Sequence, residues 1–159
     1  MSPKFIKHIL FVFFLISYSL FSQEKDSLAD YSHKKLRSLY HEVKYKDTSA
    51  SRIYLHKMLT NAKTTNNVYN VSETSILLAK SENSIGNYNK AIPYIESATQ
   101  LAKSISNEDL EAQSLFVRGV IDYDNGNYDN AFNAYIKALA YYKKTGHKLM
   151  INSISHNIA

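Results

Sequence analysis

The sequence contains no cysteine and no tryptophan, and it has only four glycines and two prolines among 159 residues. The lack of cysteine excludes disulfides, thiolate metal sites, cysteine nucleophiles and the lipid-modified cysteine of a lipoprotein. So few glycines and prolines argue against a turn-rich β-sandwich or a collagen-like repeat. Hydrophobic residues make up 45% of the chain and charged residues 21%, which is the balance of a globular protein. The length allows one domain.

Residues 1–22 have the three parts of a secretory signal peptide. Lys4 and Lys7 form a basic start, an apolar run covers residues 9–16, and small residues follow up to Ser22. This pattern predicts cleavage near Ser22, export through the inner membrane, and a mature protein in the periplasm, in the cell envelope or outside the cell. The alternative is an uncleaved membrane anchor, although a spanning helix needs about 20 apolar residues.

Without this segment the chain is only weakly basic. The whole sequence has 19 Lys and Arg against 14 Asp and Glu, and removing Lys4 and Lys7 leaves 17 against 14, a net charge of +3. These cations are scattered or lie beside acids, whereas nucleic-acid binding requires many cations on one surface. We therefore expect no nucleic-acid partner for this segment, and a membrane contact only if residues 1–22 are retained.

A repeat with a period of 40 residues organises the rest of the chain. Residues 86–98 return as residues 126–138 with identical residues at five positions. These pairs are Gly86/Gly126, Asn87/Asn127, Tyr88/Tyr128, Ala91/Ala131 and Ala98/Ala138. Apolar residues continue at spacings of three and four in both copies, which indicates a helix with one buried face. A second helical pattern precedes each glycine, so each copy is predicted to be helix, Gly-Asn turn, helix.

The turns supply residues that end and begin helices. The glycine of each turn can take a positive φ just after the first helix, and the asparagine that follows can cap the second helix. Asn70 and Ser106 are each followed three residues later by an acid, which predicts two further helix starts.

These positions resemble the tetratricopeptide repeat family. The resemblance rests on small, bulky and turn residues at matching positions of the two copies: Ala79/Gly119, Gly86/Gly126, Tyr88/Tyr128, Ala91/Ala131, Ile95/Tyr135 and Ala98/Ala138. It implies an all-α fold, an α-solenoid of antiparallel helix-turn-helix repeats, in which the three tyrosines occupy packing positions. The period of 40 is longer than the usual period of about 34, and the proline that commonly ends a repeat is absent.

The period divides the chain into five segments. After residues 1–22, residues 23–69 are predicted to be a degenerate N-terminal repeat or cap, with Ser51, Leu55, Met58 and Ala62 as its buried stripe. Residues 70–106 and 107–146 are the two clear repeats, and residues 147–159 are the first helix of an incomplete further repeat. Solenoid ends usually carry a polar cap, but this last helix presents an apolar stripe. We therefore expect either the N-terminal part of a longer protein or self-association through this helix.

The resemblance implies binding of a protein or peptide on a concave face formed by the first helix of each repeat. Its candidates are Lys80, Asn83, Phe116, Val120, Tyr123 and Asp124, and the face also includes Glu73, Ile76, Ser84 and Gln113. Phe116 and Tyr123 are the expected anchors because aromatic side chains dominate binding hot spots. Phe116 also fits a stripe packed between helices, and both interpretations stay open. A second function class is the sensor region of a membrane-associated signal-transduction regulator, whose output domain lies beyond residue 159.

The sequence carries no motif for catalysis or metal binding. The histidines form no HExxH pair, the glycines form no phosphate-binding run, and residues 122–126 lack the glycine and glutamate positions of a calcium loop. We expect no enzymatic activity, no metal and no cofactor.

Overall fold

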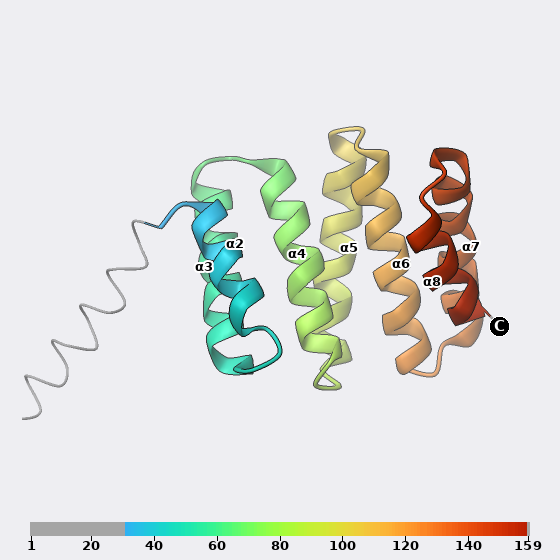
Figure 1. The fold of residues 1–159 in the computed structure, drawn as a ribbon, viewed down its shortest axis with the longest axis horizontal. Helices are drawn as coiled ribbons and strands as arrows, with labels where there is room; N and C mark the ends of the chain where they lie inside the picture. Colours follow the sequence, from blue (N-terminus) through green and yellow to red (C-terminus); the bar gives the residue numbers. More distant parts are fainter. Residues whose placement is uncertain (1–30, 159) are drawn as a thin grey trace, which may run out of the picture.

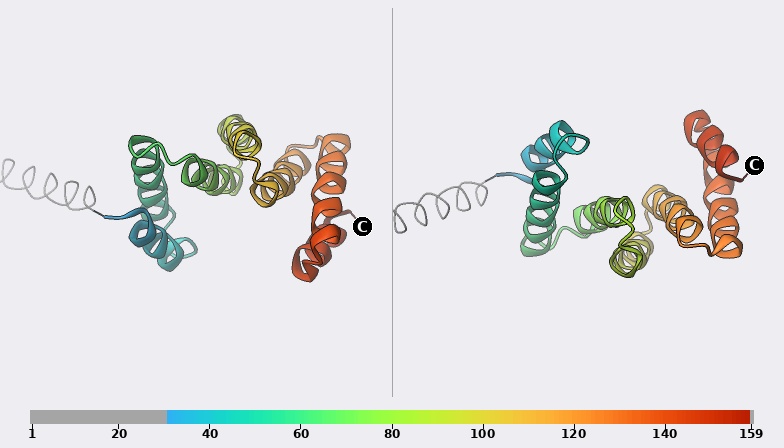
Figure 2. Two further views of the ribbon diagram at one scale, coloured as in Figure 1. Left: turned by 90° about the horizontal axis from the view of Figure 1, so that it is seen from above. Right: turned by 90° about the horizontal axis from the view of Figure 1, so that it is seen from below.

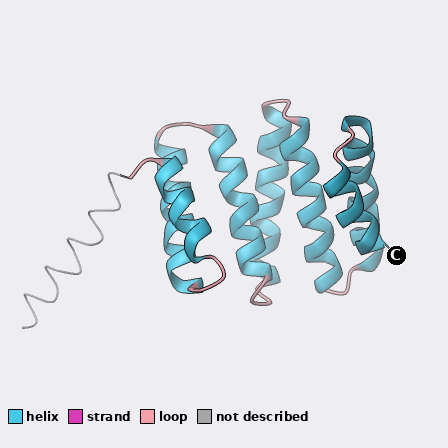
Figure 3. Ribbon diagram, viewed as in Figure 1, coloured by secondary structure: helices cyan, strands magenta, loops and turns pink. Residues whose placement is uncertain are grey.

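The computed structural model describes residues 31–158, which form seven α-helices joined by short turns. In chain order the helices are α2 (His33–Val43), α3 (Thr48–Thr64), α4 (Val68–Asn83), α5 (Tyr88–Ser104), α6 (Glu108–Asp124), α7 (Tyr128–Thr145) and α8 (Lys148–Ile158). No strand occurs in this part of the chain (Figure 3). The predicted all-α fold is confirmed, whereas the predicted signal peptide at residues 1–22 lies outside the described residues.

The helices stack side by side as antiparallel pairs, α2 with α3, α4 with α5 and α6 with α7, and α8 packs on α7 (Figure 1). Helix α4 also contacts α6, so the first helices of successive pairs form a row of their own. Seen from above, this row lies on one side of the stack, with α3, α5 and α7 toward the other side (Figure 2). This arrangement is the predicted α-solenoid. The row of first helices, called the inner row below, forms the surface on which a partner was expected to bind.

The turns between pairs repeat every 40 residues, but their caps differ from the prediction. Asn66 and Ser106 have left-handed backbones with φ of 50° and 51°, and Gly146 has the same conformation with φ of 71°. Because Ser106 is used in the turn, it cannot adopt the extended backbone of an N-cap. The residues after Asn66 and Ser106 cap instead: the side chain of Asn67 accepts from the Asn70 amide at 3.0 Å, and Asn107 accepts from Leu110 at 2.9 Å. Asn70 and Ser106 are therefore not N-caps.

The turns within pairs also differ from expectation in one respect. Gly86 and Gly126 have positive φ values of 73° and 80°, as predicted. The asparagines after them precede α5 and α7, but neither makes a side-chain cap. The Asn87 amide instead donates to Oε2 of Glu82 at 2.9 Å, because this carboxylate is buried beneath the turn and needs donors.

Buried acids at equivalent positions anchor the ends of α4 and α6. Glu82 is 1% exposed and Asp122, forty residues later, is 2% exposed. Arg52 on α3 donates to Glu82 at 2.6 Å, which ties the first helix pair to the second. Arg118 donates to Asp122 at 2.7 Å within α6 and to Glu96 on α5 at 2.9 Å. Each acid is compensated by a guanidinium, as a buried charge requires.

The core of residues 31–158 consists of three apolar clusters along the stack, each formed by one helix pair and the helix that follows it. The predicted small and bulky positions lie in them: Ala79, Ala91, Ala98, Ala131, Tyr135 and Ala138 are all buried. Helices α6 and α7 approach each other closely at Gly119, since a Cβ built on Gly119 would lie 2.5 Å from Cδ1 and Cε1 of the Tyr135 ring. In the other copy the equivalent residues are Ala79 and Ile95, which are both fully buried in one apolar cluster.

The two repeat tyrosines differ in their surroundings. Tyr88 is partly buried and packs against the cluster of α4, α5 and α6. Tyr128 is 63% exposed, and its ring contacts the ring of Tyr123 edge to face at 5.3 Å.

Candidate functional site

Four of the six predicted binding residues line one hollow on the inner row. Lys80 and Asn83 reach it from α4, and Phe116 and Val120 reach it from α6. Its volume is about 170 Å³. Helices α4 and α6 bring these residues together because equivalent helices of successive repeats lie side by side.

A second hollow of about 250 Å³ continues the first toward α8. The two share Lys80, Phe116 and Val117, so they form one groove across α4, α6 and the start of α8. His147 and Met150 line the far end. The sequence prediction did not include this pair, and the 40-residue period gives no signal for it, because the equivalent residues Asn107 and Leu110 line neither hollow.

Phe116 both packs between helices and lines the groove, which are the two interpretations that the sequence left open. Its ring lies 6.0 Å from the ring of buried Tyr135, centroid to centroid, at an angle of 44°. Its other side lines both parts of the groove. Packing on Tyr135 fixes the orientation of Phe116, and a fixed aromatic side chain loses little entropy when a ligand binds.

Tyr123 and Asp124 lie apart from the groove, at the end of α6. Tyr123 is 53% exposed, and its ring contacts Tyr128 edge to face at 5.3 Å. Asp124 accepts a hydrogen bond of 2.6 Å from the Asn83 side chain, which links the ends of α4 and α6. The geometry therefore does not place Tyr123 beside Phe116 as a second anchor.

Glu73 also differs from the expected groove residue. It is 9% exposed, and Arg37 on α2 contacts it at 2.8 Å, with His33 at 3.8 Å. The carboxylate thus holds the first helix pair against α4 and is not available to a ligand. The pairing could not be predicted because Arg37 lies in the segment whose repeat pattern is degenerate.

Burial controls the ionisation of the tyrosines behind the groove. Desolvation raises the pKa of Tyr135 to about 12, with a smaller contribution from the negative charge of Asp124. Burial likewise raises the pKa of Tyr142, which lines the second hollow. Both phenols are therefore neutral at physiological pH and add no charge to the groove.

Residues 31–158 contain no group of three or more His, Asp or Glu side chains placed to hold a metal ion. None of the helices formed by these residues is both long and apolar enough to cross a membrane.

A family model described as tetratricopeptide repeat matches residues 70–144, which include nearly all of α4 to α7. This match agrees with the stacked helix pairs and with the repeated small residues between them. Residues 70–144 therefore form tetratricopeptide repeats. These repeats indicate a protein–protein interaction module, and repeats of this family are typically non-catalytic. No curated protein and no solved structure was found to match the chain.

Proposed function

We propose that the inner groove of these tetratricopeptide repeats binds an extended segment of a partner protein. The main support for this proposal is a single hollow that continues toward α8 and is lined by Lys80, Asn83, Phe116 and Val120. Phe116 and Val120 supply an apolar floor, and exposed Lys80 supplies a cation at its edge. The module acts by binding on a rigid surface and makes no covalent bond.

The groove favours an extended ligand over a compact one. Its two parts have volumes of about 170 and 250 Å³, and they run across successive repeats. A polypeptide with an apolar side chain over Phe116 would remove that ring from water, and one buried aromatic anchor contributes about 2 kcal/mol or more to such interfaces.

The proposal is tested by affinity capture of partners with the wild type, Phe116→Ala and Lys80→Glu. Lys80 is exposed, so its substitution changes the groove without disturbing the core. We expect both variants to lose at least one partner that the wild type captures, with recovery lowered about tenfold or more for Phe116→Ala.

Phe132→Ala is the matched control, because Phe132 lies on α7, is 51% exposed and lines neither part of the groove. It should capture the same partners as the wild type. If Phe116→Ala and Lys80→Glu fold normally by circular dichroism and still recover every partner at wild-type yield, the inner groove is not the binding surface.

Export of the protein is also our proposal, supported by the signal-peptide pattern of residues 1–22. N-terminal sequencing of the protein from envelope fractions should find a new terminus near Gln23. An intact Met1 in all of the protein would contradict cleavage.

Two other sequence predictions stay predictions. They are self-association through residues 147–159 and a sensor role with an output domain beyond residue 159.

A further inference from the structure

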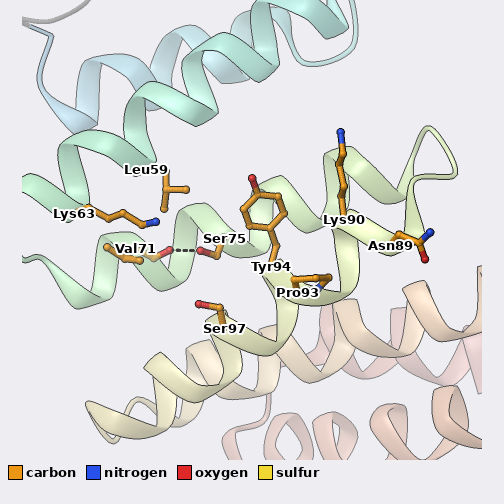
Figure 4. Close-up of a pocket in the computed structure, with 9 residues that line it drawn as sticks. All are labelled: Leu59, Lys63, Val71, Ser75, Asn89, Lys90, Pro93, Tyr94 and Ser97. Carbon is orange, nitrogen blue, oxygen red and sulfur yellow. Dashed lines mark hydrogen bonds between the residues drawn. The ribbon is translucent and has the colours of Figure 1, made fainter.

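A second groove lies between α3 and α5, and α4 forms its floor (Figure 4). Its volume is about 410 Å³, larger than either part of the inner groove. The lining includes Leu59 and Lys63 from α3, Val71 from α4, and Lys90, Pro93 and Tyr94 from α5. None of its lining residues belongs to the inner groove, so the two surfaces are separate.

The charge of this second groove has one sign. No acidic residue lines it, and Lys63 and Lys90 are exposed and take part in none of the ion pairs found among residues 31–158. An adjoining hollow of about 200 Å³ shares Lys63 and Val71 and extends the groove past Val68 to Leu101. The surface therefore combines two cations with an apolar floor.

The groove lies at the first junction, which is the boundary between the first and second helix pairs. The next junction, between the second and third pairs, does not have the same charge. Forty residues after Val68 and Val71 stand Glu108 and Glu111. Glu111 pairs with Lys103, the equivalent of Lys63, at 3.6 Å, and Glu108 pairs with Lys144 at 3.2 Å. The cations of that junction are thus compensated within the protein, whereas valines replace both acids at the first junction.

The backbone of α5 adds a hydrogen-bond acceptor to the groove wall. Pro93 lies inside α5 and has no N–H, so the carbonyl of Asn89 cannot receive the usual helical hydrogen bond from it. Asn89 also lines the groove, and Figure 4 shows it beside Pro93 and Lys90. An amide of a bound polypeptide could satisfy this carbonyl.

We propose that the α3–α5 groove is a second docking site, which binds an extended acidic segment of a partner protein. Carboxylates of that segment pair with Lys63 and Lys90, which form no ion pair within residues 31–158. Its apolar side chains lie on Val71, Pro93 and Tyr94. Complementary charge steers such a segment to the groove and excludes basic segments.

The test titrates the full chain with a fluorescein-labelled peptide in which Glu and Leu alternate, and follows fluorescence anisotropy at low salt. A peptide in which Gln replaces Glu is the neutral comparison. We expect the acidic peptide to bind about tenfold more tightly than the neutral one. Val71→Glu copies the compensated junction at Glu111 and should weaken binding of the acidic peptide about tenfold, as should Lys63→Glu.

Lys137→Glu is the matched control, because it makes the same charge change on an exposed position of α7 outside both grooves. It should change the dissociation constant by less than about twofold, since a distant exposed charge is screened. Phe116→Ala should bind the acidic peptide as the wild type does, so this result is independent of the inner groove.

Four outcomes would overturn the proposal. They are no binding of the acidic peptide by the wild type, equal losses for Lys137→Glu and Lys63→Glu, unchanged binding by folded Val71→Glu, and loss of binding in Phe116→Ala. The last would assign the acidic peptide to the inner groove.

Discussion

Gly119→Ala is expected to lower the free energy of unfolding by at least about 2 kcal/mol, because the added methyl group would overlap a buried ring. Its Cβ would lie 2.5 Å from two carbons of Tyr135, which is 2% exposed and cannot swing into solvent. Alanine favours a helix over glycine by about 1 kcal/mol, so the observed loss is what remains after this gain. Chemical denaturation followed by circular dichroism measures it.

A second substitution should offset part of this loss of stability, and the preceding repeat shows which one. In the preceding repeat the equivalent positions hold Ala79 and Ile95, both fully buried in one apolar cluster, so Gly119→Ala combined with Tyr135→Ile reproduces a combination that the protein already buries. Tyr135→Ile alone should destabilise by leaving a cavity. We expect the double variant to be more stable than the sum of the two single losses predicts, by about 1 kcal/mol or more. Additive losses would contradict a steric clash with this ring.

Arg52→Met is expected to destabilise the protein by about 3 kcal/mol, because it leaves the carboxylate of Glu82 buried without its cation. The pair is short, at 2.6 Å, and the Glu82 side chain is 2% exposed. Methionine keeps most of the aliphatic stem of arginine, so the loss reports the charge. Unfolding by urea, followed by circular dichroism, measures the change.

Lys144→Met is the control for this prediction. It removes an ion pair of 3.2 Å with Glu108, but both side chains are largely exposed, at 72% and 64%. Exposed pairs contribute less than about 1 kcal/mol, so this variant should stay close to the wild type. Similar losses for the two variants would show that burial of Glu82 does not set the cost. Adding Glu82→Gln to Arg52→Met should recover part of the stability, since it removes the buried charge.

The fold could be predicted because its signal is repeated. Gly86 and Gly126, with the alanines that follow each, recur at one fixed shift, and only helix pairs that pack closely need small residues at these offsets. Lys80 and Phe116, predicted on one face from the sequence, line one hollow because equivalent helices lie side by side. The succession of helix pairs could therefore be predicted without knowing which side chains contact each other.

The polar contacts could not be read in the same way. Glu73 and Glu82 look like surface acids in sequence, and they are buried because Arg37 and Arg52 reach them from another helix pair. Tyr123, predicted on the same face as Phe116, lines neither hollow for a related reason. A helical stripe gives the direction of a side chain around the axis, but it does not show how far the neighbouring helix extends.

The left-handed residues Asn66, Ser106 and Gly146 mark where one structural unit ends and the next begins. Each complete unit starts on a capping asparagine and finishes on a left-handed residue, so the units run over residues 67–106 and 107–146. A cut at this point keeps each capping asparagine with the helix that it caps. The one backbone bond that crosses it, such as the 2.9 Å bond from the Asn107 amide to the Ala102 carbonyl, forms again when the first residue of another unit follows. Whole units could thus be duplicated, exchanged or deleted as cassettes, and a designer who wishes to lengthen the array should join copies there.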